Sequence, residues 1–137
     1  MTGKEYLEQL IEKDTAIRRK RQRLETLRSV ATNLSIEYES EAVQRTRAQS
    51  PLENIMAIII DLDREIENDV NSLVNLKADV WKQLDGLTDE RYKQILWLKY
   101  AEQKTWREIG AAIHYTARYA KMLKPHALRS FEQVFQK

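Results

Sequence analysis

Six apolar residues recur at every seventh position through the middle of the chain. The ladder consists of Leu52, Ile59, Ile66, Leu73, Val80 and Leu87. A period of seven returns a side chain to the same face after two helical turns, whereas a strand changes face at every residue. Three glycines and two prolines in 137 residues also leave few points at which a helix must break. The pattern therefore predicts an all-α fold.

A less regular apolar stripe precedes the ladder. Between residues 7 and 38 apolar side chains recur at helical spacing, interrupted by Asp14 and Arg21. Each stripe predicts a helix of about 50 Å, at 1.5 Å of rise per residue. The polar segment Glu39–Gln49 joins the two helices, and we expect it to be mobile around Arg45. These features predict a long antiparallel helical hairpin, in the manner of a coiled coil.

Helix starts are marked by three capping boxes, in which a hydroxyl residue is followed three positions later by glutamate. The pairs are Thr2 with Glu5, Ser50 with Glu53, and Thr105 with Glu108. In such a box the hydroxyl and the carboxylate satisfy two otherwise unpaired amides reciprocally. The boxes predict helix starts near residues 3, 51 and 106. Thr88 is predicted to cap a further helix over residues 89–101.

Residues 106–125 carry the spacing of two short helices that cross closely. Gly110 has no side chain and would let the two backbones approach, and Thr116 stands where the second helix needs a cap. Apolar side chains fall at Ile109, Ile113, Tyr115, Ala120 and Leu123. This pattern is typical of a helix-turn-helix, whose second helix enters the major groove of DNA. The predicted domains are therefore the helical hairpin, residues 1–86, and a DNA-binding domain, residues 87–137.

The side chains that follow Thr116 are the candidates for reading base edges. They are Ala117, Arg118, Tyr119 and Met122. Arg118 is the strongest of them, because its fork can address the two acceptors of guanine. Candidates for phosphate contact are Lys104, Thr105, Arg107, Thr116, Lys121 and Lys124. Each role has an ordinary alternative, which is solvation for the cations, capping for Thr105 and packing for Met122. Tyr115 and Trp106 are expected to pack in the core.

Basic residues are concentrated in the predicted DNA-binding domain. Residues 86–137 hold ten Lys or Arg against five Asp or Glu, whereas residues 1–85 hold thirteen against sixteen. A local basic surplus suits the phosphates of DNA. A separate basic run, Arg18–Arg23, precedes a stretch, residues 51–85, with eight acids against three bases. We favour pairing of these charges across the hairpin, and the alternative is a contact with nucleic acid or RNA polymerase.

The length of the apolar ladder also bears on assembly. Over five heptads it exceeds what one narrow partner helix can cover. We therefore expect self-association, as a homodimer that forms through the helical hairpin.

Composition argues against enzymatic and membrane functions. The chain has no cysteine, and its two histidines, His114 and His126, have no acidic companions at a metal-binding spacing. It also lacks a glycine-rich phosphate loop and a nucleophile–base pair with a third orienting group. No apolar run approaches membrane-spanning length, and the first five residues are already charged. We predict a soluble intracellular protein that is not an enzyme and uses no metal or cofactor.

Short motifs in the C-terminal part carry a resemblance to a known group. They are Arg91-Tyr92, Leu98-Lys99-Tyr100, Lys104-Thr105-Trp106, Glu108-Ile109 and Ala127-Leu128 with Phe131. In these residues the chain resembles region four of sigma factors, and more closely the phage-encoded, sigma-like helix-turn-helix regulators related to the ArpU and RinA late-gene regulators. The N-terminal helices resemble that group as well. The resemblance implies a phage or prophage regulator in the cytoplasm of a bacterial host cell, which activates late genes with host RNA polymerase.

Three residues depart from the pattern of that group. Gln103 and His114 stand where glycine is common, so both are predicted to need a positive φ or an altered turn. Pro125 lies inside what is often one continuous helix, where a proline removes an amide and clashes with the preceding turn. We therefore predict a break near Lys124, followed by a separate terminal helix over His126–Phe135.

Two other functions compete with a transcription regulator that binds double-stranded DNA. A small-terminase-like packaging protein also joins a helix-turn-helix to an oligomerising helical region, and it would form a ring of roughly eight or more subunits. A helical protein-interaction module would hold a protein partner and would not bind DNA at low salt. The oligomeric state and the DNA affinity separate the three.

Overall fold

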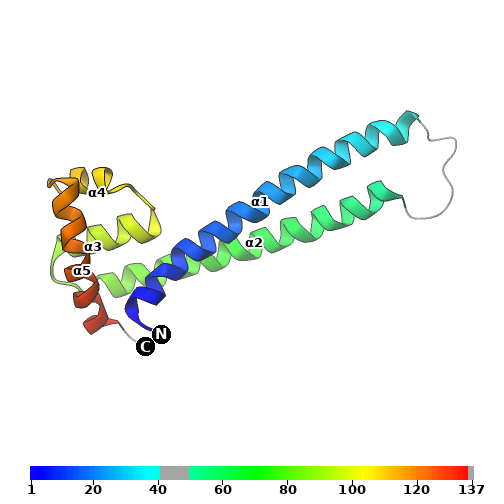
Figure 1. Cartoon of the computed structure of the whole chain (residues 1–137). Helices are drawn as coiled ribbons and strands as arrows, with labels where there is room; N and C mark the ends of the chain where they lie inside the picture. Colours follow the sequence, from blue (N-terminus) through cyan, green and yellow to red (C-terminus); the bar gives the residue numbers. More distant parts are fainter. Residues whose placement is uncertain (41–49, 136–137) are drawn as a thin grey trace. The chain divides into compact units, whose positions relative to one another are not determined.

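The computed structural model describes residues 1–40 and 50–135, and the side chains of residues 38–40 are outside the description. The described chain is helical and contains no strand, so the predicted all-α class is confirmed (Figure 1). The predicted mobility around Arg45 falls outside the described residues. The elements in chain order are α1 (Gly3–Ser40), α2 (Pro51–Leu84), α3 (Glu90–Leu96), the π-helical turn η2 (Trp97–Ala101), α4 (Trp106–Ala112) and α5 (Ala117–Val134).

The three predicted helix starts are confirmed by their capping bonds. The hydroxyls of Thr2 and Ser50 each accept the amide N–H three residues ahead, at 3.1 and 3.2 Å. Thr105 and Glu108 form the reciprocal box, with N–H donated to the hydroxyl at 3.2 Å and to the carboxylate at 3.0 Å. The local signals were sufficient here because each cap involves residues only three positions apart.

The predicted cap of the third helix is wrong by one residue. Asp89, and not Thr88, caps α3, because its carboxylate accepts the amide N–H of Arg91 at 2.9 Å. The same carboxylate also accepts the Arg91 guanidinium at 2.9 Å. An ionised acceptor with two oxygens holds both donors and attracts the charged guanidinium, whereas a threonine hydroxyl is neutral.

The ionisation of Asp89 makes the stability of the fold depend on pH. The hydrogen bond from the Arg91 guanidinium, more than any other contact, holds the pKa of Asp89 below its ordinary value of 3.8. A carboxyl with a lowered pKa stabilises the fold at neutral pH, and this contribution is lost as the pH falls through that pKa. We expect Asp89→Asn to remove about 1 kcal/mol or less of acid-sensitive stability. Urea midpoints measured between about pH 2 and pH 6 should fall less steeply for the variant than for the wild type. Parallel curves would contradict the assignment.

The described chain divides into two compact units. Unit 1 comprises residues 1–14 together with the chain from residue 72 onward, and unit 2 comprises residues 15–71. Both long helices thus contribute to each unit.

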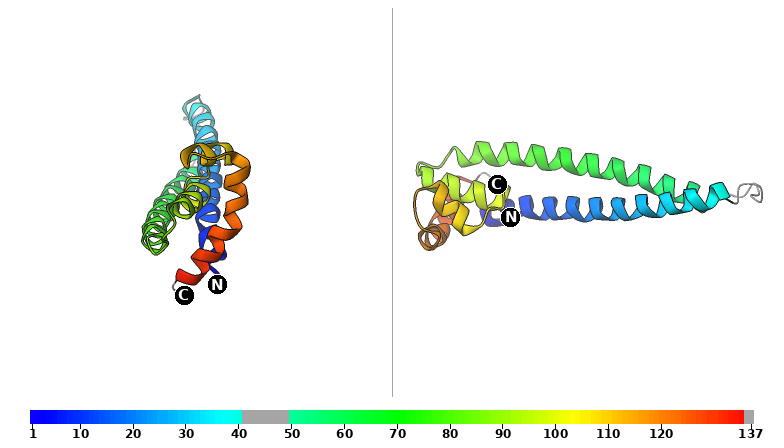
Figure 2. Two further views of the ribbon diagram at one scale, coloured as in Figure 1. Left: turned by 90° about the vertical axis from the view of Figure 1, so that its left-hand side faces the viewer. Right: turned by 90° about the horizontal axis from the view of Figure 1, so that it is seen from above.

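Unit 2 is built from the distal part of α1 and the first part of α2, which run side by side in opposite directions (Figures 1 and 2). Lys20 forms an ion pair with Asp69 at 2.7 Å, and Arg28 pairs with Asp63 at 3.4 Å. The first pair joins the basic run Arg18–Arg23 to the acidic stretch of residues 51–85, as expected, and Arg28 lies outside that run. Its buried cluster consists of Leu24, Ala31, Ile59, Leu62 and Ile66.

Four of the five ladder side chains in α2 are buried within the single chain, and the fifth, Leu52, is half-buried. Ile59, Ile66, Leu73 and Val80 are between 0 and 8% exposed. One chain therefore covers the ladder from Ile59 to Val80, although we expected the ladder to exceed what one partner helix can cover. The exposed apolar side chains of α2 lie beside the ladder positions instead, and they include Met56, Ile58, Ile60, Val74 and Trp81.

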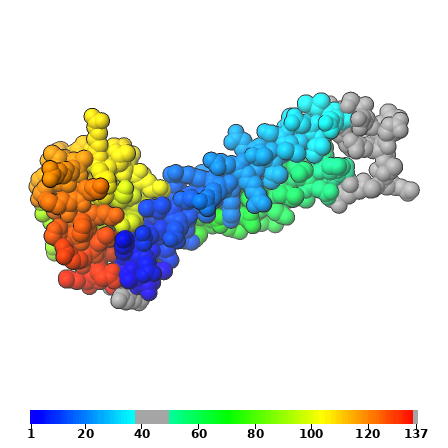
Figure 3. All heavy atoms as spheres, in the orientation of Figure 1, coloured from blue at the N-terminus to red at the C-terminus, as the bar shows by residue number. Residues whose placement is uncertain are grey.

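Unit 1 joins the two ends of the chain. The amide N–H of Gly3 donates to the Glu132 carboxylate at 2.7 Å, and the ring of Tyr6 stacks on Phe131 with 6.5 Å between centroids. A Cβ on Gly3 would lie 2.9 Å from the Phe131 ring, which shows how closely α1 approaches α5. In Figure 3 the start of α1, in dark blue, lies against the red and orange atoms of α5. The first turn of α1 is therefore part of the C-terminal unit.

The predicted break at Pro125 is wrong. Helix α5 runs without interruption from Ala117 to Val134 with Pro125 inside it, and no separate terminal helix exists. Pro125 is exposed, as is Lys121 one turn earlier, so water can satisfy the carbonyl that the missing amide leaves unpaired. Burial of Ala120, Leu123, Ala127 and Phe131 on the opposite face holds the helix together across the proline.

Both predicted positive φ angles are confirmed. Gln103 has a φ of 53° and His114 a φ of 64°. His114 ends α4 by donating its amide to Ala111, while the next amide donates to Gly110 at 2.8 Å. The side chain of Gln103 donates to Asp14 at 2.8 Å, which offsets the strain of its backbone. Asp14, an exception in the apolar stripe of α1, thus holds the turn before α4.

Candidate nucleic-acid interface

A small apolar cluster fixes α4 and α5 against α3. Its fully buried members are Ile95 on α3, Ile109 on α4 and Ala120 on α5, each 0% exposed. Ile113 and Leu123 complete the cluster. The cluster takes side chains from all three helices. The face of α5 that points away from the cluster is free to meet solvent or a ligand.

Gly110 sets the distance between α4 and the start of α5. A Cβ at this position would lie 2.7 Å from the carbonyl carbon of Thr116 and 2.8 Å from the amide nitrogen of Ala117. Both atoms belong to the backbone, so neither can move aside as the end of a flexible side chain can. The close approach that the sequence predicted from this glycine is confirmed.

Thr116 begins α5 as predicted. Its hydroxyl accepts the amide N–H of Tyr119 at 3.1 Å. The first two turns of the helix then expose Arg118, Lys121 and Met122, and Met122 is 56% exposed. Ala117 is half-buried at the start of the helix. Three of the predicted DNA-binding side chains thus share one solvent-facing surface, which we call the α5 face (Arg118, Lys121 and Met122).

Tyr119 lies apart from the α5 face. Its ring packs against the apolar cluster and stacks on Tyr115 with 4.6 Å between centroids, and its hydroxyl accepts from Arg91 at 3.3 Å. Tyr119 therefore has partners of its own, although it was predicted to read bases. The expected burial of Tyr115 is wrong, because this side chain is 45% exposed. It forms the outer layer of a stack in which the Arg91 guanidinium also lies 5.8 Å from the Tyr115 ring.

The predicted phosphate contacts at the start of α4 are already partly engaged. Glu108 accepts the amide of Thr105, and its carboxylate also lies 4.0 Å from the ammonium of Lys104. These bonds from the backbone amide and from the hydroxyl side chain of Thr105 hold the pKa of Glu108 below its ordinary value, so the carboxylate stays charged. Arg107 is exposed beside it and is the cation here that remains available to an anion.

The ammonium group of Lys124 lies beside two aromatic rings. It lies 5.6 Å from the ring centroid of Tyr100 and 6.0 Å from that of Trp106. Burial is the main cause that lowers its pKa. Trp106, expected in the core, is half-buried and packs against the apolar cluster of α3, α4 and α5.

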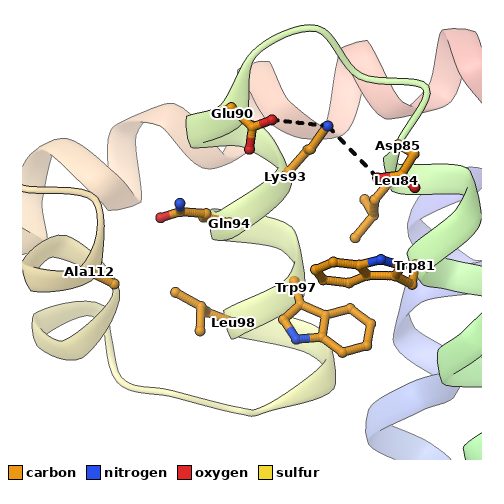
Figure 4. A pocket seen from close by; sticks show the side chains of 9 residues that line it. All are labelled: Trp81, Leu84, Asp85, Glu90, Lys93, Gln94, Trp97, Leu98 and Ala112. Atoms are coloured by element: carbon orange, nitrogen blue, oxygen red, sulfur yellow. Dashed lines mark hydrogen bonds and ion pairs between the residues drawn. The ribbon is translucent and has the colours of Figure 1, made fainter.

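A pocket of about 400 Å³ opens between the end of α2, α3 and the end of α4 (Figure 4). Trp81 forms one wall with 53% of its surface exposed, and it meets Trp97 edge to face at 4.9 Å. Along the rim, the ammonium of Lys93 forms ion pairs with Glu90 at 3.1 Å and with Asp85 at 3.8 Å. No pattern in the sequence predicted this pocket, although Trp81 stands one position off the apolar ladder. An apolar wall with an ion-paired rim suits non-covalent binding.

The described residues therefore present surfaces for binding. Within them no group of three or more histidines, cysteines or acids could hold a metal ion. None of the helices in this part of the chain is both long and apolar enough to cross a membrane. Comparison of the whole chain with protein-family models, with curated proteins and with solved structures finds no match.

Proposed function

We propose that this protein is a sequence-specific transcription regulator that binds double-stranded DNA. The observation that carries the proposal is the α5 face, because Arg118, Lys121 and Met122 are exposed on the first turns of a capped helix. In a helix-turn-helix these turns are the ones that enter the major groove. The closeness of α4 at Gly110 and the shared apolar cluster support the assignment of α4 and α5 to that motif.

Each side chain of the α5 face suits a different part of the groove. Arg118 can donate two hydrogen bonds to the acceptors of a guanine. Met122 can pack on the methyl group of a thymine, and Lys121 can reach a phosphate as a point charge. Arg107 would meet the backbone from the start of α4. Sequence preference therefore rests mainly on Arg118, and affinity on the lysines.

We further propose that the protein is a late-gene activator encoded by a phage or prophage. The support is the resemblance of Arg91-Tyr92, Lys104-Thr105-Trp106 and Phe131 to sigma-like phage regulators. We propose that it binds at a promoter in the bacterial cytoplasm and works there with host RNA polymerase. The helical hairpin of α1 and α2 would serve as the arm for dimerisation, supported by exposed Met56, Ile58 and Ile60.

A selection from random duplexes tests the proposal. The wild type should enrich a short motif that contains guanine, and Arg118→Ala should abolish the enrichment while retaining most binding at low salt. Arg129→Ala is the matched control, since this exposed arginine lies three turns further along the same helix and outside the groove. The control should enrich the wild-type motif. Loss of preference in both variants, or in neither, would contradict the proposal.

The Trp81–Trp97 pocket favours one competing function, a module that binds a protein. An exposed tryptophan beside a cavity is a common feature of protein interfaces. Light scattering combined with the DNA selection separates the possibilities. A dimer that selects a motif agrees with the regulator, a ring of roughly eight or more subunits agrees with a packaging protein, and no DNA binding at low salt agrees with the protein-binding module.

A further inference from the structure

Two lysines from different helical elements of unit 1 lie over the ring of Trp106. The Lys99 ammonium lies 4.9 Å from the Trp106 ring centroid, and the Lys124 ammonium lies 6.0 Å from it. Lys121 precedes Lys124 by three residues on α5, and Lys4 follows Gly3, whose amide N–H donates to Glu132 of the same helix at 2.7 Å. Besides burial, the charges of Lys4, Lys99 and Lys121 lower the pKa of Lys124. We call these four residues the lysine cluster (Lys4, Lys99, Lys121 and Lys124).

The cluster is poorly neutralised by the protein itself. Among the described residues no carboxylate forms an ion pair with any of the four lysines, although the charge of Glu8 opposes the effect of the other lysines on Lys124. Like charges held together disfavour the folded state. A bound polyanion would remove this repulsion.

The lysines are positioned before any ligand arrives. Lys4 follows Gly3, whose amide is tied to Glu132 at 2.7 Å, so the first turn of α1 is held against α5. Lys99 and Lys124 lie over aromatic rings and cannot move as freely as ordinary surface lysines. A ligand that meets such groups loses less side-chain entropy on binding.

The aromatic rings beside the lysine cluster bear on whether it suits a duplex or a single strand. Unpaired bases bind proteins mainly by stacking on aromatic faces. At Tyr100 and Trp106 ammonium groups already lie over the rings, and Tyr100 is 3% exposed. The cluster therefore suits the phosphates of a duplex better than a single strand.

Lys121 links the cluster to the α5 face. It lies one helical turn from Arg118 on one side and one turn from Lys124 on the other. We propose that the lysine cluster binds the phosphate backbone flanking the groove that Arg118 reads, with Lys4 and Lys99 as contacts outside the helix-turn-helix. This inference rests on the proposed DNA-binding function and extends its contact surface to the first turn of α1.

The salt dependence of binding to a mixed-sequence duplex tests the inference. Each lost phosphate contact should reduce the slope of log affinity against log salt by about 0.9. The double variant Lys4→Ala/Lys99→Ala should therefore show a slope smaller by about 2, and affinity lower by roughly tenfold or more at moderate salt. Its motif in the random-duplex selection should be that of the wild type. The control, Lys82→Ala, removes an exposed lysine of α2 and should change neither quantity.

The outcomes separate this inference from the function on which it rests. A wild type that binds no duplex overturns both. A wild type that binds, combined with an unchanged slope in the double variant, overturns the inference alone. Lys99→Gln removes the charge but keeps a polar side chain that is only one atom shorter, so it controls for a loss caused by misfolding. It should reduce the slope by about 1. Binding of a single strand as tight as that of the duplex would also contradict the assignment.

Discussion

Replacement of Phe131 by alanine is expected to lower the free energy of unfolding of unit 1 by about 4 kcal/mol. Phe131 is 0% exposed, and its ring contacts those of Tyr6 of α1 and Phe135, at centroid distances of 6.5 and 5.8 Å. Truncation leaves a cavity and removes one of the ring contacts that hold the first turn of α1. Urea unfolding followed by tryptophan fluorescence measures the effect, because Trp81, Trp97 and Trp106 all belong to unit 1.

Met122→Ala is the control for this measurement. Met122 lies on the same helix but is 56% exposed, so its truncation should change the free energy by less than about 0.5 kcal/mol. Hydrogen exchange adds a local readout. The amides of residues 6–10 should exchange faster in Phe131→Ala, since they depend on contact with α5. A loss below about 1 kcal/mol would show that the two ends of the chain are not packed as described.

Gly110→Ala is expected to destabilise unit 1 by about 3 kcal/mol. In an ordinary helix this substitution is favourable by about 1 kcal/mol, because alanine has the higher helix propensity. Here the added methyl group would lie 2.7 to 2.8 Å from the backbone of Thr116 and Ala117. The start of α5 must then shift away from α4, and the α5 face shifts with it. The sign of the effect, measured by the same urea unfolding, therefore distinguishes the close crossing from an ordinary helical glycine.

Ala111→Ser, at the position next to Gly110, is the control for this substitution. Ala111 is exposed on α4, and a hydroxyl there should alter stability by less than about 0.5 kcal/mol. An increase in the stability of Gly110→Ala would contradict the geometry of the α4–α5 crossing. Reduced DNA affinity should accompany the loss of stability, because the crossing positions Arg118.

Features governed by neighbouring residues could be predicted from the sequence. The box of Thr105 and Glu108, the cap at Thr116 and the positive φ of His114 each depend on residues within one helical turn. The apolar ladder predicted the burial of Ile59 and Val80 for the same reason, since the helical period repeats locally. Gly110 was predictable because only glycine permits so close a crossing.

Features governed by tertiary packing could not be predicted. Proline is expected to break a helix because it lacks the amide for one backbone hydrogen bond. At Pro125 the burial of Ala127 and Phe131 beyond it outweighs the loss of that hydrogen bond. Tyr115 was expected inside because it is large and partly apolar, yet it stacks on Tyr119 from outside. The sequence gives no sign that the first turn of α1 contacts α5, since 128 intervening residues separate Gly3 from Glu132.

The π-helical turn η2 is the clearest source of missed contacts. Its five residues, Trp97–Ala101, follow α3 directly and change the angular spacing of the side chains. As a result Tyr100 is buried, where burial raises its pKa to about 12, and Lys99 lies over Trp106. A regular helical period extended through this segment does not predict that arrangement.

Chemical-shift mapping by nuclear magnetic resonance tests the central claim, that DNA occupies the α5 face. A short duplex added at low salt should shift the signals of Arg118, Lys121 and Met122, with smaller shifts at Lys99. Signals of unit 2, including the exposed Arg19 and Arg21, should remain in place. Shifts confined to those arginines or to the Trp81–Trp97 pocket, or no shifts at all, would contradict the account.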